Sequence, residues 1–271
     1  MGISHYHLSF HVRSYEVGRW GIVSSGTLLR YLEYLATEGS AAAGYPRSWY
    51  DEHDTAWVVR QMAFEQERPI ELGELLALET WPSQFARIQA HREYLVSSAS
   101  TGQMLARAHA HWVYVSRQRG LPTRLPVDFT EHAIPDPQEV TLAPAPAFQR
   151  VVGESFQFQM ALRARRLEAD TMGHVNNSVY MDWLEEAVYE AIDALPSSFL
   201  EQSEALSPSH RCFVKRAKLD YMKPCLPGEL VEIETTCAGM YEGGLAWQQV
   251  VTRPATQETL LRAESLWSWL A

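Results

Sequence analysis

The chain has 271 residues, of which 46% are hydrophobic and 21% charged, a composition that supplies enough apolar material for one large domain or two moderate ones. Its formal net charge of −10 excludes a global basic field, so we expect neither nucleic acid nor an anionic membrane as a partner. No apolar run approaches the roughly 20 residues that a membrane span needs. The three cysteines, Cys212, Cys225 and Cys237, are odd in number and all lie in the second half, which fits a reducing cytoplasm better than a disulfide framework. No pair has CxxC spacing, which argues against a zinc site. We expect no metal and no cofactor.

The first half begins with a partly alternating segment at 7–17, which predicts an extended strand. Leu28, Leu32, Leu35 and Ala36 then recur at helical spacing and predict a helix. Segments rich in Val, Trp, Tyr and Thr follow and predict long strands, with Gly and Pro at the turns between them. These strands are expected at residues 57–68, 74–83, 86–98 and 104–117.

Residues 121–148 contain six prolines without sustained periodicity, which is typical of an extended linker. The sequence on either side of this segment repeats itself. GIVSS (21–25) matches GHVNN (173–177), RPIELGELLALET (68–80) matches KPCLPGELVEIET (223–235), and LARAHAHWVYV (105–115) matches LLRAESLWSWL (260–270). Three blocks in the same order indicate a duplicated unit. We therefore expect an N-terminal unit at 1–120, a Pro-rich linker at 121–150 and a C-terminal unit at 151–271.

The second half repeats the order of elements, with an extended segment at 155–169 and then a helix. Val179, Trp183, Ala187 and Val188 set its helical spacing. One helix followed by a multi-stranded antiparallel sheet is an α+β layout in which the sheet wraps the helix. This is the layout of a hotdog domain, so the whole chain is predicted to be a tandem, or double, hotdog.

The two copies differ in chemistry where the first strand leads into the helix. The second copy carries polar groups there, at Asp170, Gly173, His174, Asn176 and Asn177, whereas the first has Gly18, Gly21, Ile22, Ser24 and Ser25. Helix capping explains the Asn and Ser positions equally well in both copies. It does not explain Asp170 and His174. A carboxylate and an imidazole at a helix N-terminus are suited to attack on a carbonyl, because N–H groups there can hold an oxyanion.

Five motifs follow one another along the chain: FHVRSYEVG (10–18), WVVRQM (57–62), LETW (78–81), TGQMLARAHAHWVYV (101–115) and HVNNSVYMDWLEE (174–186). They stand in the order of the acyl-acyl carrier protein thioesterase family, which this chain resembles over almost its whole length. The resemblance implies a double hotdog fold, an acyl-[acyl-carrier-protein] hydrolase activity and a catalytic motif Asp-x-Asn-x-His-Val-Asn-Asn. Met172 replaces the first Asn of that motif. Where the plant members have a Glu–Cys pair, this chain has Pro224 and Cys225.

The stretch ADTMGHVNN also resembles the 4-hydroxybenzoyl-CoA thioesterase arrangement, in which an Asp three residues before a Gly carries the chemistry. This implies Asp170 as general base or nucleophile, His174 as a group that positions water or the thioester, and oxyanion donors near Gly173. Asn176 is the fourth catalytic candidate. Asn177 and Cys225 are assigned to substrate binding, although a small buried residue is the simpler interpretation of Cys225.

The leading hypothesis is thus a thioesterase that releases free fatty acid from acyl carrier protein, with a non-catalytic first unit that lines the acyl pocket. Two alternatives stay open: an acyl-CoA thioesterase of the 4-hydroxybenzoyl-CoA type, and a non-catalytic acyl-binding hotdog protein. The expected partners are acyl carrier protein or acyl-CoA, and a homodimer is left open. An acidic carrier protein would meet basic residues, for which the candidates are Arg163, Arg165, Arg166, Lys215 and Lys218.

Overall fold

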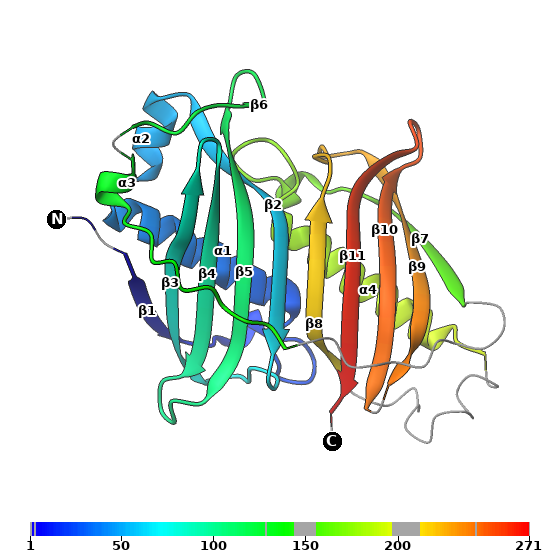
Figure 1. Ribbon diagram of the computed structural model, residues 1–271. Helices are drawn as coiled ribbons and strands as arrows, with labels where there is room; N and C mark the ends of the chain where they lie inside the picture. Colours follow the sequence, from blue (N-terminus) through cyan, green and yellow to red (C-terminus); the bar gives the residue numbers. More distant parts are fainter. Residues whose placement is uncertain are drawn as a thin grey trace. The chain divides into compact units, whose positions relative to one another are not determined.

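The computed structural model describes residues 4–127, 129–143, 156–196, 212–241 and 243–270, together with Gly2. The chain divides into two compact units, the first formed by residues 1–23 and 27–143 and the second by residues 24–26 and 144–271. Each unit holds one long helix and one antiparallel sheet, as Figure 1 shows.

The first unit has five long strands in the order β1-β3-β4-β5-β2, and each neighbouring pair is antiparallel. The two-residue strand β6 pairs with β5. Its elements are β1 (Tyr6–His11), the 3-10 helix η1 (Ser14–Glu16), α1 (Ser25–Ala42), α2 (Arg47–Glu52), β2 (Thr55–Gln66), β3 (Leu75–Ala86), β4 (Gln89–Ser98), β5 (Met104–Ser116), β6 (Leu121–Pro122) and α3 (Phe129–His132).

The second unit repeats this arrangement strand for strand, with the order β7-β9-β10-β11-β8. Its elements are β7 (Gln157–Arg163), the 3-10 helix η2 (Arg166–Glu168), α4 (Asn177–Asp193), β8 (Cys212–Tyr221), β9 (Leu230–Tyr241), β10 (Gly244–Arg253) and β11 (Glu258–Trp269). The duplication that the sequence indicates is therefore present in the order and direction of the strands.

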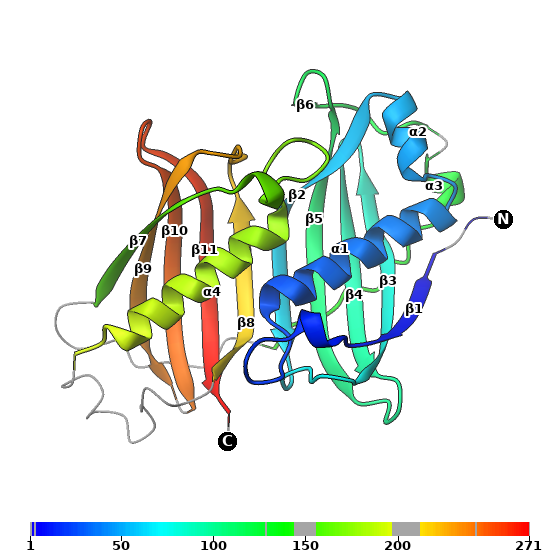
Figure 2. The same cartoon turned by 180° about the vertical axis from the view of Figure 1, so that it is seen from behind.

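The long helix of each unit lies along one face of that unit's sheet (Figure 2). In the first unit the fit is close at Gly39 of α1, where an added Cβ would lie 3.2 Å from the Cβ of Tyr6 on β1. In the second unit Val179, Leu184 and Val188 of α4 are all nearly inaccessible to solvent. Buried residues occur on most sides of α4, as expected for a helix held within a curved sheet. None of the helices in the described part of the chain is long and apolar enough to cross a membrane.

Part of the segment expected to be a linker packs into the first unit. Residues 121–143 cluster with that unit, and the buried ring of Phe129 stacks on Tyr45 with centroids 4.1 Å apart. Residues 144–150 of the expected linker lie outside the described residues. Helices α2 and α3 were not expected from the sequence, because six and four residues are too few to establish helical periodicity.

Candidate active site

The polar groups singled out in the second half lie on the turn that joins η2 to α4. The turn is closed by backbone bonds: Asp170 N–H donates to the carbonyl of His174 at 2.8 Å, and Gly173 N–H donates to the carbonyl of Asp170 at 3.1 Å. Gly173 has φ +79°, a conformation that side-chain-bearing residues rarely adopt. The positive φ at position 173 is therefore sufficient to explain why a glycine stands there.

The corresponding turn of the first unit has the same backbone bonds without the polar side chains. Gly18 N–H donates to the carbonyl of Ile22 at 3.0 Å, Gly21 N–H donates to Gly18 at 2.9 Å, and Gly21 has φ +74°. The turn therefore forms when glycine and isoleucine stand in place of the carboxylate and the imidazole. Folding of this loop does not require Asp170 or His174.

The Asp170 carboxylate faces back over its own turn. Its Oδ1 accepts the backbone N–H of Met172 at 2.7 Å and that of His174 at 3.3 Å. Met172 replaces the family's Asn at a position that contacts Asp170 through the main chain, and any residue other than proline supplies that N–H. Asp170 and His174 are both partly accessible, so solvent reaches the two groups.

Asn176 caps helix α4. Its backbone is extended, and its Oδ1 accepts the N–H of Ser178 at 2.8 Å and the hydroxyl of Ser178 at 2.6 Å. Asn177 is the first residue of the helix, and its carbonyl accepts the hydroxyl of Tyr221 at 3.1 Å. The capping interpretation thus holds for Asn176, and Asn176 and Asn177 directly follow the turn that bears Asp170.

Cys225 contacts the turn through its main chain. Its carbonyl accepts the N–H of Val175 at 2.9 Å, and its own N–H donates to the hydroxyl of Tyr180 at 2.9 Å. The side chain is fully buried, and burial is the main cause that raises the pKa of the thiol to about 12. A thiol of that pKa is a poor nucleophile at neutral pH. Tyr180 was not singled out from the sequence, where its helical spacing indicates only a core residue.

The basic candidates for carrier binding fall into two separate groups. Arg163, Arg165 and Arg166 lie at the end of β7 and on η2, close in sequence to the Asp170 turn, and are exposed. Lys215 and Lys218 lie on β8, the strand at the opposite end of this unit's strand order. Leu167, 99% exposed, sits among the arginines. The arginines are thus neighbours along the chain, whereas the lysines lie on a strand at the other end of the strand order.

Glu185, one turn of α4 beyond Met181, is a buried acid with a strongly shifted pKa. Its carboxylate oxygens accept the N–H of Ser25 at 3.1 Å, and Oε2 accepts the N–H of Gly26 at 3.5 Å; both residues belong to the short segment 24–26 that clusters with the second unit. Burial raises the pKa of Glu185 to about 7 and outweighs these hydrogen bonds, which lower it. These contacts to backbone donors indicate a structural group.

Comparison with known proteins assigns the chain to a family. The acyl-ACP thioesterase N-terminal domain model matches residues 4–133, and the C-terminal domain model of the same family matches residues 154–268. The two matches together span most of both units. The chain belongs to the acyl-ACP thioesterase family.

Individual relatives agree with this assignment at low identity. A chloroplastic acyl-acyl-carrier-protein hydrolase of Cuphea viscosissima is 22% identical over 96% of this chain, and the chloroplastic oleoyl-acyl carrier protein thioesterase 1 of Arabidopsis thaliana is 24% identical over 85%. The matches span 60% and 63% of the lengths of those two proteins. The solved 12:0-ACP thioesterase of Umbellularia californica superimposes with a TM-score of 0.72 at 21% identity, over 98% of this chain and 94% of that one. The chain has the hotdog fold of these proteins.

Proposed function

We propose that this protein hydrolyses the thioester between a fatty acyl group and acyl carrier protein, releasing free fatty acid and carrier. Both halves match the family, and the Cuphea and Arabidopsis relatives are named for this reaction. The proposal includes a tandem of two hotdog units, supported by the identical strand order in each. The first unit, expected at 1–120, is non-catalytic in this proposal, and the second, expected at 151–271, carries the active site.

The assignment of the active site rests on one observation, the comparison of the two turns. The loop folds with the same backbone bonds whether it bears Gly18 and Ile22 or Asp170 and His174. The carboxylate and imidazole are therefore available for chemistry. We assign Asp170 as general base or nucleophile and His174 as the group that positions water or the thioester.

The hydrogen bonds of Asp170 suggest how the turn would act. In the structure Oδ1 accepts the N–H of His174 at 3.3 Å, a long bond that is easily exchanged. If the carboxylate turns toward water or the thioester, that N–H becomes free at the N-terminus of α4. A donor released at this point can hold the oxyanion that forms during attack.

Asn176 and Asn177 complete the proposed site in supporting roles. Asn176 fixes the start of α4 and with it the direction of the N–H groups above the turn. Asn177, next in the chain, is proposed to contact the substrate. Cys225 is proposed to line the site through its position and not as a nucleophile, because of its buried thiol.

The three cysteines are free thiols, and each is buried. Unpaired thiols are usual in a reducing compartment. The cytoplasmic location that the sequence favours stays a prediction.

The test is hydrolysis of acyl carrier protein and acyl-CoA panels by wild type, Asp170→Asn and Asp193→Asn. Asp193 is the exposed last residue of α4 and serves as the matched control. We expect Asp170→Asn to lower kcat/KM by at least about 100-fold, as loss of a general base does, and Asp193→Asn to leave it unchanged.

Each other outcome identifies an alternative. Preference for acyl-CoA over the carrier would favour the acyl-CoA thioesterase. Acyl binding without turnover by wild type would mean a non-catalytic acyl-binding protein. Full activity of Asp170→Asn would refute the assignment of Asp170.

A further inference from the structure

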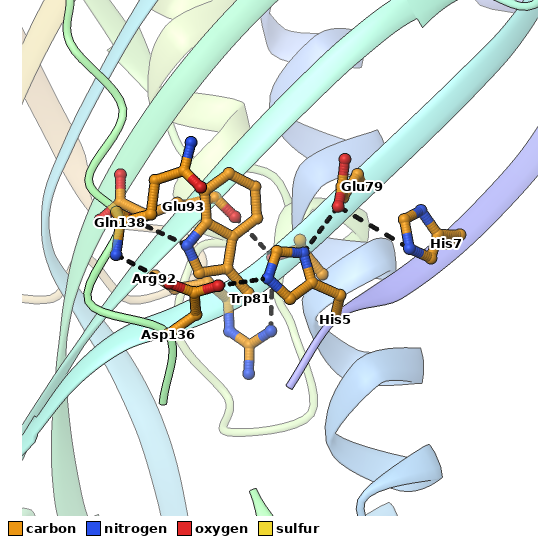
Figure 3. A network of polar contacts seen from close by, with 9 residues as sticks. His5, His7, Glu79, Trp81, Arg92, Glu93, Asp136 and Gln138 are labelled. Atoms are coloured by element: carbon orange, nitrogen blue, oxygen red, sulfur yellow. Dashed lines mark hydrogen bonds and ion pairs between the residues drawn. The ribbon is translucent and has the colours of Figure 1, made fainter. Parts of the chain in front are cut away.

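A group of metal-ligand side chains lies in the first unit, on the edge strand β1 and its neighbour β3. The antiparallel register places His7 directly opposite Glu79 and Tyr6 opposite Thr80. Because alternate residues of a strand face the same side, His5 shares the face of His7, and Trp81 shares that of Glu79. Figure 3 shows both imidazoles directed at the Glu79 carboxylate.

The three candidate ligand atoms are already close together. Glu79 Oε1 lies 2.6 Å from Nδ1 of His5 and 3.7 Å from Nε2 of His7, and one ligand atom from each residue falls within 4.8 Å of the others. Donor atoms around a tetrahedral Zn²⁺ are roughly 3.3 Å apart, given bonds of about 2 Å. Metal binding would open the 2.6 Å hydrogen bond between Glu79 and His5 and bring His7, whose side chain is 67% exposed, slightly closer to Glu79.

His5 also has the outer contacts that position a metal-binding histidine. Its second ring nitrogen, Nε2, lies 3.0 Å from Oδ2 of Asp136. Asp136 is itself held, because its Oδ1 accepts the N–H of Gln138 at 2.9 Å and its own N–H donates to the carbonyl of Pro82 at 2.9 Å. A carboxylate on the far nitrogen fixes the tautomer and orientation of a ligating imidazole.

The indole of Trp81 restrains the same ring from the side. It stacks on His5 with centroids 4.8 Å apart and planes 13° apart, and its Nε1–H donates to the carbonyl of Gln138 at 2.7 Å. His5 is thus oriented by partners on both of its nitrogens and on one face (Figure 3). Such restraint lowers the entropy that a ligand must lose when it binds a metal.

The ligand types and the charge select the class of ion. Two imidazoles and one carboxylate suit Zn²⁺ and its neighbours, whereas Ca²⁺ and Mg²⁺ prefer oxygen ligands alone. Two carboxylates, Glu79 and Asp136, surround His5. A divalent ion bound by neutral imidazoles would balance both negative charges.

We propose that His5, His7 and Glu79 form a binding site for a divalent transition-metal ion of the Zn²⁺ class, with water as the fourth ligand and Asp136 as the group that orients His5. The site would fasten the edge strand β1 to β3 and, through Asp136, to the segment that follows α3. It lies wholly in the first unit and is independent of the proposed thioesterase chemistry.

The test is titration of untagged, metal-free full-length protein with Zn²⁺, followed by calorimetry, and with Co²⁺, followed by its visible absorption. We expect one ion per chain, a Kd in the micromolar range or tighter, the intense visible bands of tetrahedral Co²⁺, and a higher Tm with Zn²⁺ present. Mg²⁺ at the same concentration should give none of these effects.

Variants separate this site from adventitious binding by surface histidines. His7→Ala removes an exposed ligand and should weaken Zn²⁺ binding at least about 10-fold without unfolding the protein, and Asp136→Asn should weaken it about 10-fold through orientation alone. His11→Ala, an exposed histidine on the same strand, is the matched control and should bind like wild type. Absence of a stoichiometric site in wild type, or equal losses in His7→Ala and His11→Ala, would show that the cluster is an ion-pair network only.

Discussion

Val175 donates its backbone N–H to the carbonyl of Cys225 at 2.9 Å, and the first unit makes the same bond between Val23 and Ile70. The position of Cys225 therefore supports the turn through a carbonyl that any residue would supply. Its buried thiol, with a pKa raised to about 12 mainly by burial, is not prepared to act as a thiolate.

Cys225→Ala should accordingly keep most of its activity. We expect kcat/KM within about threefold of wild type and a loss of about 1 kcal/mol in the free energy of unfolding, from the buried atoms removed. Steady-state kinetics and urea denaturation measure the two quantities. Inactivation of native wild type by iodoacetamide at pH 7, prevented in Cys225→Ala, would contradict the assignment.

The paired glycines of the two turns offer a second experiment with an internal control. Gly173 and Gly21 both have positive φ and no atom within 4 Å of an added Cβ, so alanine costs only backbone strain. We expect Gly173→Ala and Gly21→Ala to lose similar stability, about 1–2 kcal/mol each. Only Gly173→Ala should lower kcat/KM, because only its turn bears Asp170. A comparable loss of activity in Gly21→Ala would mean that the catalytic group is not confined to the second turn.

The raised pKa of Glu185 predicts that the free energy of unfolding depends on pH. Its pKa is raised from 4.5 to about 7 chiefly by burial, so the folded protein favours the protonated acid. The protonated side chain contributes about 3 kcal/mol to the free energy of unfolding. This contribution is complete below about pH 4.5 and is lost as the pH rises through about 7. Glu185→Gln, which keeps an acceptor but cannot ionise, should remove this dependence.

The measurement is urea denaturation of wild type and Glu185→Gln at pH 5 and pH 8. The variant should gain stability relative to wild type at the higher pH. Glu186→Gln, at the exposed neighbouring position, is the control and should follow wild type. Parallel pH profiles for wild type and Glu185→Gln would show that Glu185 titrates normally in the fold.

The arginines beside the Asp170 turn predict how the carrier is recognised. Arg165→Glu together with Arg166→Glu should raise KM for an acyl carrier protein about 10-fold with kcat nearly unchanged, and leave hydrolysis of a small acyl ester unaffected. Rising salt should reduce the difference from wild type. Lys218→Glu, on the opposite end of the strand order, is the matched control. An equal effect of Lys218→Glu would refute a docking site at the arginines.

Much of the fold could be predicted from periodicity and internal repetition. The strand expected at 104–117 is observed as β5, Met104–Ser116, and the helix expected from Val179, Trp183 and Ala187 is observed as α4. Long elements repeat their spacing often enough to be recognised. Helix α3 has four residues and is held by the packing of Phe129 on Tyr45, a contact between distant positions that local sequence does not reveal.

For the candidate site the sequence proposes residues, which stay predictions, and it does not reveal their hydrogen bonds. The contrast between Asp170 and Gly18 is visible in the sequence, whereas the engagement of Asp170 Oδ1 with the N–H of Met172 depends on the turn's backbone angles. The cluster at His5 was missed for another reason. Glu79 lies far from it in the chain and becomes its neighbour only through the register of β1 on β3.

Each turn is held by main-chain bonds, so the side chains at positions 18 and 22, or at 170 and 174, can change without altering the loop. At Gly18 an added Cβ would meet no atom within 4 Å, and its φ lies outside the range that favours glycine. A duplicated scaffold of this kind lets one copy specialise while the other retains the architecture. The two units of this chain have diverged in what their turns carry, and the first turn still has room to accept a side chain at Gly18.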